Sequence, residues 1–215
     1  MKVSKKNKKT YSVTAVYGSP RRGGNTDVLL KKFLEGLRQC RYFSSESNEE
    51  CLDLQIKEIY VSELNISPCR ECRSCSKNGQ CIVNDKMQEI YPLLVNCNLI
   101  LIASPVFFTT VSGYLKSFID RFQRFWALKY ELQEKIITPE NNKGMLFSCA
   151  GSNPENIFDC TKKVMRSLFD VLYVKYSADF CYNNIDFKGD MLKHPEITDS
   201  VYNFGKKGDF VKEVL

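Results

Sequence analysis

The chain has 215 residues, of which 43% are hydrophobic and 26% are charged, and its formal net charge is +6. These values are typical of one globular domain with a full hydrophobic core. The longest apolar run, Leu99 to Phe108, is too short to cross a bilayer, and the polar N-terminus lacks the apolar segment of a secretion signal. We therefore expect a soluble, cytoplasmic protein.

The N-terminus is basic, with five lysines among the first nine residues. This run predicts a disordered tail over residues 1–10, followed by a single domain over residues 11–215. Because the rest of the chain is nearly balanced in charge, the tail is weak support for a nucleic-acid or membrane contact. We expect neither partner.

Strand and helix patterns alternate from the start of the domain. Tyr11–Tyr17 is short and apolar, as expected of a strand, and Val28–Leu37 repeats its apolar residues at helical spacing. A second strand is predicted over Leu52–Val61. The next helix is predicted over Asp85–Cys97, with Asp85 as its cap and an interruption at Pro92.

The most apolar strand is predicted over Asn98–Ala103, whose Leu-Ile-Leu-Ile centre suits a strand that is covered on both faces. The alternation then continues to the end of the chain. We expect a helix with an apolar stripe at Leu115, Phe118, Ile119 and Phe122, a strand at Lys143–Cys149, a helix at Asn156–Leu172, a strand at Val174–Tyr182, and a terminal helix at Pro195–Val214 that frays at Gly205 and Gly208.

This alternation predicts an α/β fold in which a parallel sheet is covered by helices on both faces. Ligands of such sheets bind beyond the carboxyl ends of the strands. The loops expected at that edge are 18–26, 104–112 and 149–156, which follow the first, third and fourth predicted strands. A ligand site is therefore expected near these three loops.

The first of these loops combines glycines, hydroxyls and arginines immediately before a helix. Free N–H groups at a helix N-terminus favour anions, so the loop suits a phosphate group. A nucleotide-hydrolysing P-loop is not indicated, because Gly24 and Asn25 stand where that motif has Lys and Ser or Thr, and the G-x-G-x-x-G fingerprint is absent. The alternative is an ordinary turn in which Asn25 or Thr26 caps the helix.

Four cysteines follow one another at metal-ligand spacing after the second predicted strand: Cys69, Cys72, Cys75 and Cys81. Three cysteines that are separated by two residues each are typical of an iron–sulfur cluster. Zinc sites more often use two separated C-x2-C pairs. Zinc, free thiols and a redox disulfide are the alternatives.

The segment G-S-P-R-R-G-G-N-T at residues 18–26 resembles the loop of the NADPH-dependent FMN reductases and of the iron–sulfur flavoproteins. The resemblance covers the chain from Tyr11 to about Gly208. It implies a flavodoxin-like, doubly wound sheet of five parallel strands in the order 2-1-3-4-5, with a cysteine-rich insertion at residues 65–84. In this family the loop wraps the FMN phosphate, which implies contacts here from Ser19, Pro20, Arg21, Asn25 and Thr26.

A second segment, residues 104–121, resembles the family's loop along the isoalloxazine ring and the helix after it. Phe107 departs from the family pattern by replacing a tyrosine, and Thr109 by replacing a glycine. The resemblance implies that the cysteine motif binds a [4Fe–4S] cluster through Cys69, Cys72, Cys75 and Cys81. It implies flavin contacts from Pro105, Val106, Phe107, Phe108, Thr109 and Ser112, and from Ala150 and Gly151 after the fourth strand.

By resemblance, we expect a flavoprotein oxidoreductase with FMN and [4Fe–4S], whose donor is NAD(P)H or ferredoxin and whose acceptor is a small molecule or a protein. A homodimer or homotetramer is implied as well. One alternative keeps FMN without the cluster, as an NAD(P)H-dependent reductase of flavin, quinones or nitro compounds. Another is a flavin-free binding or regulatory module on the same fold. No catalytic side chain is expected, because the redox chemistry belongs to the cofactors.

Overall fold

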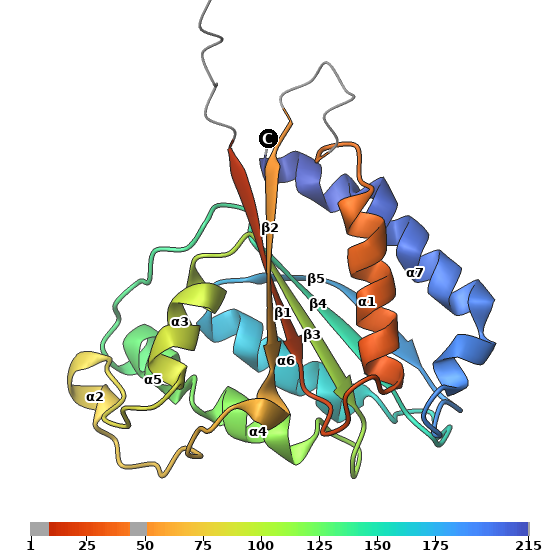
Figure 1. The fold of residues 1–215 in the computed structure, drawn as a ribbon. Coiled ribbons are helices and arrows are strands. Elements are labelled where there is room, and N and C mark those ends of the chain that lie inside the picture. The colour runs from red at the N-terminus through yellow and green to blue at the C-terminus, as the bar shows by residue number, and fades with distance from the viewer. Residues whose placement is uncertain (1–8, 44–50, 215) are drawn as a thin grey trace, which may run out of the picture.

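Five parallel strands form one sheet in the order β2-β1-β3-β4-β5, as predicted (Figure 1). The structure is a computed structural model that describes residues 9–43 and 51–214. Most of the predicted tail, residues 1–8, lies outside the described residues, and Thr10 already belongs to the first strand. The strands are β1 (Thr10–Tyr17), β2 (Asp53–Tyr60), β3 (Leu99–Pro105), β4 (Lys143–Cys149) and β5 (Lys175–Tyr182).

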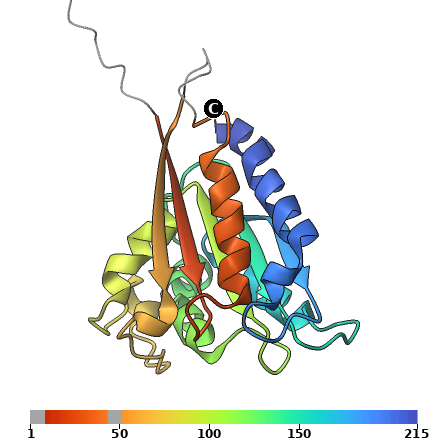
Figure 2. The same cartoon turned by 45° about the vertical axis from the view of Figure 1, so that its right-hand side comes forward.

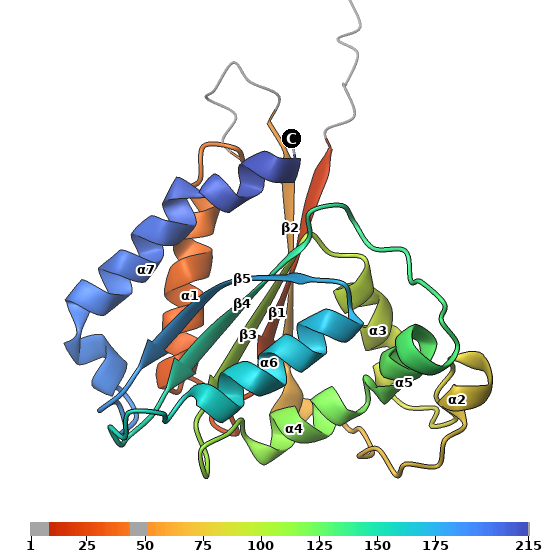
Figure 3. The ribbon, with the colours of Figure 1, turned by 180° about the vertical axis from the view of Figure 1, so that it is seen from behind.

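Helices cover both faces of this sheet. On one face, α1 (Asn25–Arg38) and α7 (Pro195–Lys207) lie side by side, as Figure 2 shows. The other face carries α3 (Met87–Val95), α4 (Gly113–Asp120) and α6 (Asp159–Val171), which lie to the right of α1 in Figure 3. Each layer buries its own hydrophobic cluster against the sheet. The fold is therefore doubly wound and flavodoxin-like.

Two glycines allow α1 and α7 to approach closely. A β-carbon on Gly36 of α1 would lie 2.0 Å from the carbonyl oxygen of Tyr202 in α7. A β-carbon on Gly205 of α7 would lie 2.4 Å from the carbonyl oxygen of Phe33 in α1. The predicted fraying at Gly205 is therefore wrong, because this glycine is a packing contact inside an intact helix.

The terminal helix is shorter than predicted. α7 ends at Lys207, and the next residue, Gly208, adopts the left-handed φ of +59° that commonly ends a helix. A separate 3-10 turn, η4 (Asp209–Val214), completes the described chain. The prediction of one helix to Val214 is thus wrong beyond Lys207.

Helix α3 runs through Pro92, which contradicts the predicted interruption. Asp85 Oδ1 accepts a hydrogen bond of 3.1 Å from the Met87 N–H at the start of the helix, so its predicted capping role is confirmed. Proline removes one helical N–H, but Tyr91 and Leu94 on either side of it are buried in the core. This packing holds the helix together across the proline.

Several short elements lie in the connections. The segment between β2 and α3 contains η1 (Val61–Glu63) and α2 (Cys75–Asn78). The helix predicted to carry an apolar stripe as far as Phe122 is shorter in the structure, because α4 ends at Asp120 and a new turn begins. The remaining elements are α5 (Gln123–Trp126), the π-helical turn η2 (Ala127–Glu131) and η3 (Asp190–Lys193). In the described ranges, no helix has the length and apolar character needed to cross a membrane.

Candidate functional site

The loops after β1, β3 and β4 enclose one hollow at the carboxyl edge of the sheet. The ends of these strands are neighbours, because Tyr17 pairs with Ala103 and Pro105 pairs with Cys149. The segment that follows β5 completes the wall. The lining residues are Ser19, Arg21, Gly24, Asn25, Thr26, Pro105, Val106, Phe107, Cys149, Gly151, Ile185 and Asp186.

Loop 18–24 folds tightly and presents the first turn of α1 to this hollow. Ser19 Oγ accepts a hydrogen bond of 3.1 Å from the Arg21 N–H, and the Gly24 N–H donates to the Arg21 carbonyl at 3.3 Å. A β-carbon on Gly24 would lie 3.3 Å from Ser19 Oγ. The N–H groups in the first turn of α1 have no acceptor within the helix, so this helix end suits an anion.

The Asn25 side chain is hydrogen-bonded to the segment that follows β5. Its Nδ2 donates to the Phe187 carbonyl at 2.9 Å, and its Oδ1 accepts from the N–H groups of Gly189 at 3.1 Å and Met191 at 3.2 Å. These bonds hold the connection between β5 and α7 against the start of α1. They thereby position residues 185–186, which the sequence patterns do not assign to the site.

The two arginines of the loop have different surroundings. Arg22 turns toward β2, where its guanidinium pairs with Glu63 and lies 3.2 Å from the ring centre of Tyr60. Arg21 lines the hollow and forms no salt bridge with any described residue. Arg21 is therefore the cation of this loop that is available to a ligand.

Asp27 is a buried carboxylate in the first turn of α1. Its Oδ2 accepts a hydrogen bond of 2.9 Å from the N–H of Gly23, whose φ is +66°. Its Oδ1 is buried and has no hydrogen-bond partner among the residues that the structure describes. Burial raises the pKa of Asp27, and the Gly23 N–H, followed by Lys31, Arg22 and Lys188, opposes that rise.

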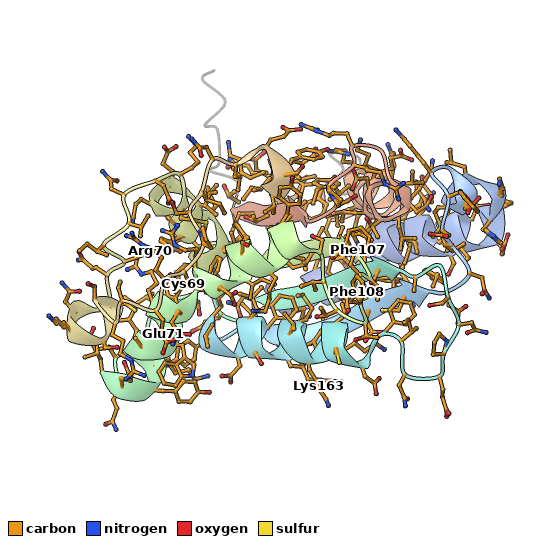
Figure 4. The ribbon with its side chains drawn as sticks, turned by 90° about the horizontal axis from the view of Figure 1, so that it is seen from below. Cys69, Arg70, Glu71, Phe107, Phe108 and Lys163 are labelled. Carbon is orange, nitrogen blue, oxygen red and sulfur yellow. The ribbon has the colours of Figure 1, made fainter. Side chains whose placement is uncertain are left out.

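The loop after β3 ends in a tight turn with an exposed tip. Phe107 and Thr110 exchange two backbone hydrogen bonds of 2.8 and 3.1 Å, and the residues between them, Phe108 and Thr109, have φ values of +47° and +65°. The side chain of Phe108 is fully exposed, whereas that of Phe107 forms part of the wall (Figure 4).

Two buried serines connect this loop to the first one. Ser104 Oγ accepts a hydrogen bond of 3.1 Å from the Ser112 N–H. Ser112 Oγ donates to the Gly18 carbonyl and accepts from the Leu115 N–H at 3.1 Å, which caps α4. A β-carbon on Gly18 would lie 2.9 Å from the carbonyl oxygen of Ala103, so the two loops meet where only glycine fits.

The structure brings together most of the residues singled out in the sequence. Those in the lining are Ser19, Arg21, Asn25, Thr26, Pro105, Val106, Phe107 and Gly151. Those outside it are Pro20, Phe108, Thr109, Ser112 and Ala150. The lining also contains Gly24, Cys149, Ile185 and Asp186, of which the last two follow β5 at the same edge of the sheet. The parallel-sheet rule, applied to the fifth strand as well, would have found them.

Cys149 lies in the wall but is a poor nucleophile. Burial raises the pKa of its thiol to about 12, so the thiol is protonated at neutral pH. Its backbone serves the loops instead, because its carbonyl accepts a hydrogen bond of 2.9 Å from the Val106 N–H.

A second hollow lies near the other end of α4, in the cysteine-rich segment. Its lining includes all four cysteines of the motif, together with Arg121, Arg124 and Trp126. Glu71 and Arg73, on either side of Cys72, have positive φ values of 50° and 55°. Left-handed backbone at residues other than glycine costs roughly 1–3 kcal/mol each and is concentrated at functional sites.

The four thiols share this hollow without being gathered at one point. Cys69 and Cys72 are exposed, and Cys75 and Cys81 are partly buried. Hydrogen bonds from the backbone and side chain of Ser74 lower the pKa of Cys72, whereas burial, followed by the neighbouring cysteines, raises that of Cys75. In the part of the chain that the structure describes, no three His, Cys, Asp or Glu side chains are placed to hold a metal ion.

Figure 4 shows residues from the two hollows, seen from below. Cys69, Arg70 and Glu71 lie at one end of the molecule, and Phe107 and Phe108 lie well apart from them. Helix α4 lies between the two groups, with its N-terminus beside the loop after β3. The two hollows are therefore separate sites of one chain.

Comparison with known proteins shows which proteins this chain resembles. A family described as NADPH-dependent FMN reductase matches residues 11–168. An iron-sulfur flavoprotein of Archaeoglobus fulgidus is 28% identical over 165 residues, which are 77% of this chain and 66% of that protein. An iron-sulfur flavoprotein of Methanosarcina thermophila is 25% identical over 162 residues, which are 75% of this chain and 73% of that protein.

Solved structures agree on the fold. The NAD(P)H:quinone oxidoreductase from Methanothermobacter marburgensis superposes with a TM-score of 0.61 and covers 92% of this chain and 96% of its own. Its sequence is 15% identical, so this likeness concerns the fold alone.

Proposed function

The chain belongs to the NADPH-dependent FMN reductase family, and we propose that it is a flavoprotein oxidoreductase with FMN at the carboxyl edge of the sheet and a [4Fe–4S] cluster on the four cysteines. The observation that carries the proposal is the convergence of the loops after β1, β3 and β4 on one hollow that ends at the N-terminus of α1. When bound, FMN takes two electrons from a hydride donor and releases them singly, and a [4Fe–4S] cluster carries one electron at a time.

The phosphate of FMN would be held at loop 18–24. The first-turn N–H groups of α1, the Thr26 hydroxyl and the guanidinium of Arg21 suit a phosphate dianion. The Ser19 hydroxyl donates to the Arg21 carbonyl at 3.1 Å, so it would have to turn to donate to the phosphate. Pro20 shapes the bend between Ser19 and Arg21. Asn25 would contribute its backbone N–H, because its side chain already forms three hydrogen bonds with residues 187–191.

The flavin ring would lie along the loop after β3 and the turn after β4. Pro105, Val106 and Phe107 offer an apolar surface, and Phe107 is 43% exposed without a ligand. Ala150 and Gly151 bring backbone to the other side, where a β-carbon on Gly151 would lie 2.7 Å from Asp186 Cγ. Three further proposed residues act from beside this surface: Ser112 fixes its position, and Phe108 and Thr109 at the exposed tip would contact a ring that extends beyond the hollow.

The cluster would be held by Cys69, Cys72, Cys75 and Cys81. All four line one hollow. The residues on both sides of Cys72 have left-handed backbone, which is energetically unfavourable and is concentrated at functional sites. The relatives named as iron-sulfur flavoproteins support the same assignment. Binding would require the four thiols to move together, since they are not gathered in the described structure.

We further propose NAD(P)H or ferredoxin as the electron donor and a small molecule or a protein as the acceptor. A homodimer or homotetramer is proposed as the working form. Trp126 is 39% exposed and Tyr130 is 50% exposed, and both lie beside the cysteine-rich hollow on the segment that would supply part of a subunit interface.

A second candidate function keeps FMN and omits the cluster. The observation that favours it is the spread of the four thiols, which leaves no preformed metal site in the described ranges. The protein would then be an NAD(P)H-dependent reductase of flavin, quinones or nitro compounds.

The cofactor content of protein prepared without oxygen tests the proposal. We expect FMN in the supernatant after denaturation, about four irons and four acid-labile sulfides per chain, and a visible spectrum that dithionite bleaches. Cys72→Ser should lose the iron, and Cys160→Ser, an exposed cysteine outside the motif, should retain it. FMN without iron would establish the second candidate, and a colourless protein after FMN reconstitution would reject both.

A further inference from the structure

Arg121 is a fully buried cation directly after α4. Its side chain is 0% exposed, and the partner carboxylate of Asp85 is 14% exposed. Taking a guanidinium out of water costs several kcal/mol unless hydrogen bonds replace its hydration. The partners of Arg121 therefore show what the surrounding chain is arranged to hold.

These partners lie on both flanks of the cysteine motif. Arg121 Nη1 donates to Asp85 Oδ2 at 2.6 Å and to the Ser67 carbonyl at 2.8 Å. Arg121 Nη2 donates to Asp85 Oδ1 at 3.2 Å and to Cys81 Sγ at 3.5 Å. The Ser67 N–H also donates to Asp85 Oδ2 at 3.0 Å, although the two residues are 18 positions apart. One guanidinium thus closes the cysteine-rich loop at its base.

Two details are unusual for an ion pair that only stabilises the fold. First, the Cys81 thiol is among the acceptors of the Arg121 guanidinium, although an ion pair with Asp85 alone would stabilise the fold. In addition, Arg121 Nε is buried and has no hydrogen-bond partner among the described residues. An unmet donor in a buried site costs about 1–3 kcal/mol. Arg121 thus holds a buried positive charge, through Nη2, at the sulfur of a proposed cluster ligand.

We propose that Arg121 is the positioning residue of the cysteine-rich loop, closing the loop before a cluster binds and fixing a positive charge at the Cys81 sulfur. The inference rests on the proposed [4Fe–4S] site. Positive charge and N–H donors at a ligand sulfur favour the more negative, reduced state of a cluster, and so raise its reduction potential.

The Arg121–Asp85 pair provides two variants with opposite expected effects. Arg121→Gln removes the positive charge and should lower the midpoint potential of the cluster. Asp85→Asn removes the compensating negative charge and should raise it. A role limited to folding predicts changes in cluster content and no opposite shifts. Potentials that shift in the same direction, or not at all, would overturn the electrostatic part of the proposal.

Arg124 supplies a matched control. Its Nε donates to the Gly79 carbonyl in the same loop at 2.9 Å, and among the described residues it forms no hydrogen bond to a cysteine sulfur. Arg124→Gln should therefore loosen the loop and shift the potential less than Arg121→Gln does. Arg121→Lys keeps the charge, so it should retain a potential close to that of the wild type even if Arg121→Gln folds poorly.

Hydrogen exchange on the cluster-free protein tests loop closure separately. The Ser67 amide, which donates to Asp85, should lose protection in Arg121→Gln and in Arg121→Lys, because neither replacement reaches both flanks. Unchanged protection would overturn the positioning role. If the wild-type protein binds no iron, the proposed cluster fails, whereas the exchange result still decides whether Arg121 closes the loop.

Discussion

Asn25 and Phe187 are 162 residues apart in the sequence, and the Asn25 side-chain amide donates a hydrogen bond of 2.9 Å to the Phe187 carbonyl. With the two bonds from Gly189 and Met191, this side chain holds the wall segment after β5. We expect Asn25→Ala to lower the free energy of unfolding by about 2 kcal/mol, since two partly buried bonds and one buried bond are lost. Urea denaturation without FMN measures this. Asn153→Ala, at an exposed position, is the control, and equal stability of the two variants would contradict the assignment.

The two arginines of loop 18–24 should differ in their effect on FMN binding. Arg21→Gln should raise the dissociation constant for FMN roughly ten-fold or more, because a charge-assisted bond to phosphate is lost. Arg22→Gln should have a much smaller effect, since Arg22 is engaged with Glu63 and Tyr60. Quenching of FMN fluorescence on titration measures both constants. Equal losses for the two variants would show that Arg21 is not the phosphate ligand.

Ionisation of Asp27 should lower the free energy of unfolding, which is the opposite of the usual effect of a paired carboxylate. Burial raises its pKa in the folded protein above the value of about 4 in the unfolded chain. Above its raised pKa the folded state carries this buried charge, and protonation on acidification relieves it. We expect Asp27→Asn to be more stable than the wild type at neutral pH, with a difference that shrinks as the pH falls through the folded pKa. Urea midpoints across that range measure the effect, and a variant less stable at neutral pH would contradict it.

The turn at Phe108 and Thr109 stores strain that a glycine would relieve. Thr109 has a φ of +65°, a conformation that costs a residue with a β-carbon roughly 1–2 kcal/mol. We expect Thr109→Gly to raise the thermal midpoint. Thr110→Gly, outside the left-handed region, should lower it by adding freedom to the unfolded chain. A decrease for both variants would mean that the Thr109 side chain contributes more than its strain costs.

The fold could be predicted because each layer leaves a local pattern. The unbroken apolar run that begins at Leu99 predicts a strand covered on both faces, and β3 occupies the middle of the sheet. The alternation of strands and helices then leaves few topologies. The continuity of α3 at Pro92 was not predictable, because the tertiary packing of Tyr91 and Leu94 outweighs the tendency of proline to interrupt a helix.

The sequence predicted which residues lie together where the candidate site is local in sequence. Loop 18–24 carries its own glycines and hydroxyls, and it forms the expected helix-end cradle. The part formed by distant contacts was not predictable, including the use of the Asn25 side chain and the position of Asp186. Arg121 gives no local sign of its role either, since its partners at Ser67 and Asp85 meet it only in the folded protein.

Helix α4 joins the two hollows, and its length sets their spacing. Ser112 caps its start and Arg121 follows its end, and eight helical residues span about 12 Å. Leu115 and Phe118 are buried, so the helix cannot slide without disturbing close-packed side chains. α4 is thus a rigid spacer between the two hollows. Replacing the loop at either end of α4 would change the lining of the hollow at that end. The distance between the two ends of the helix would be unchanged.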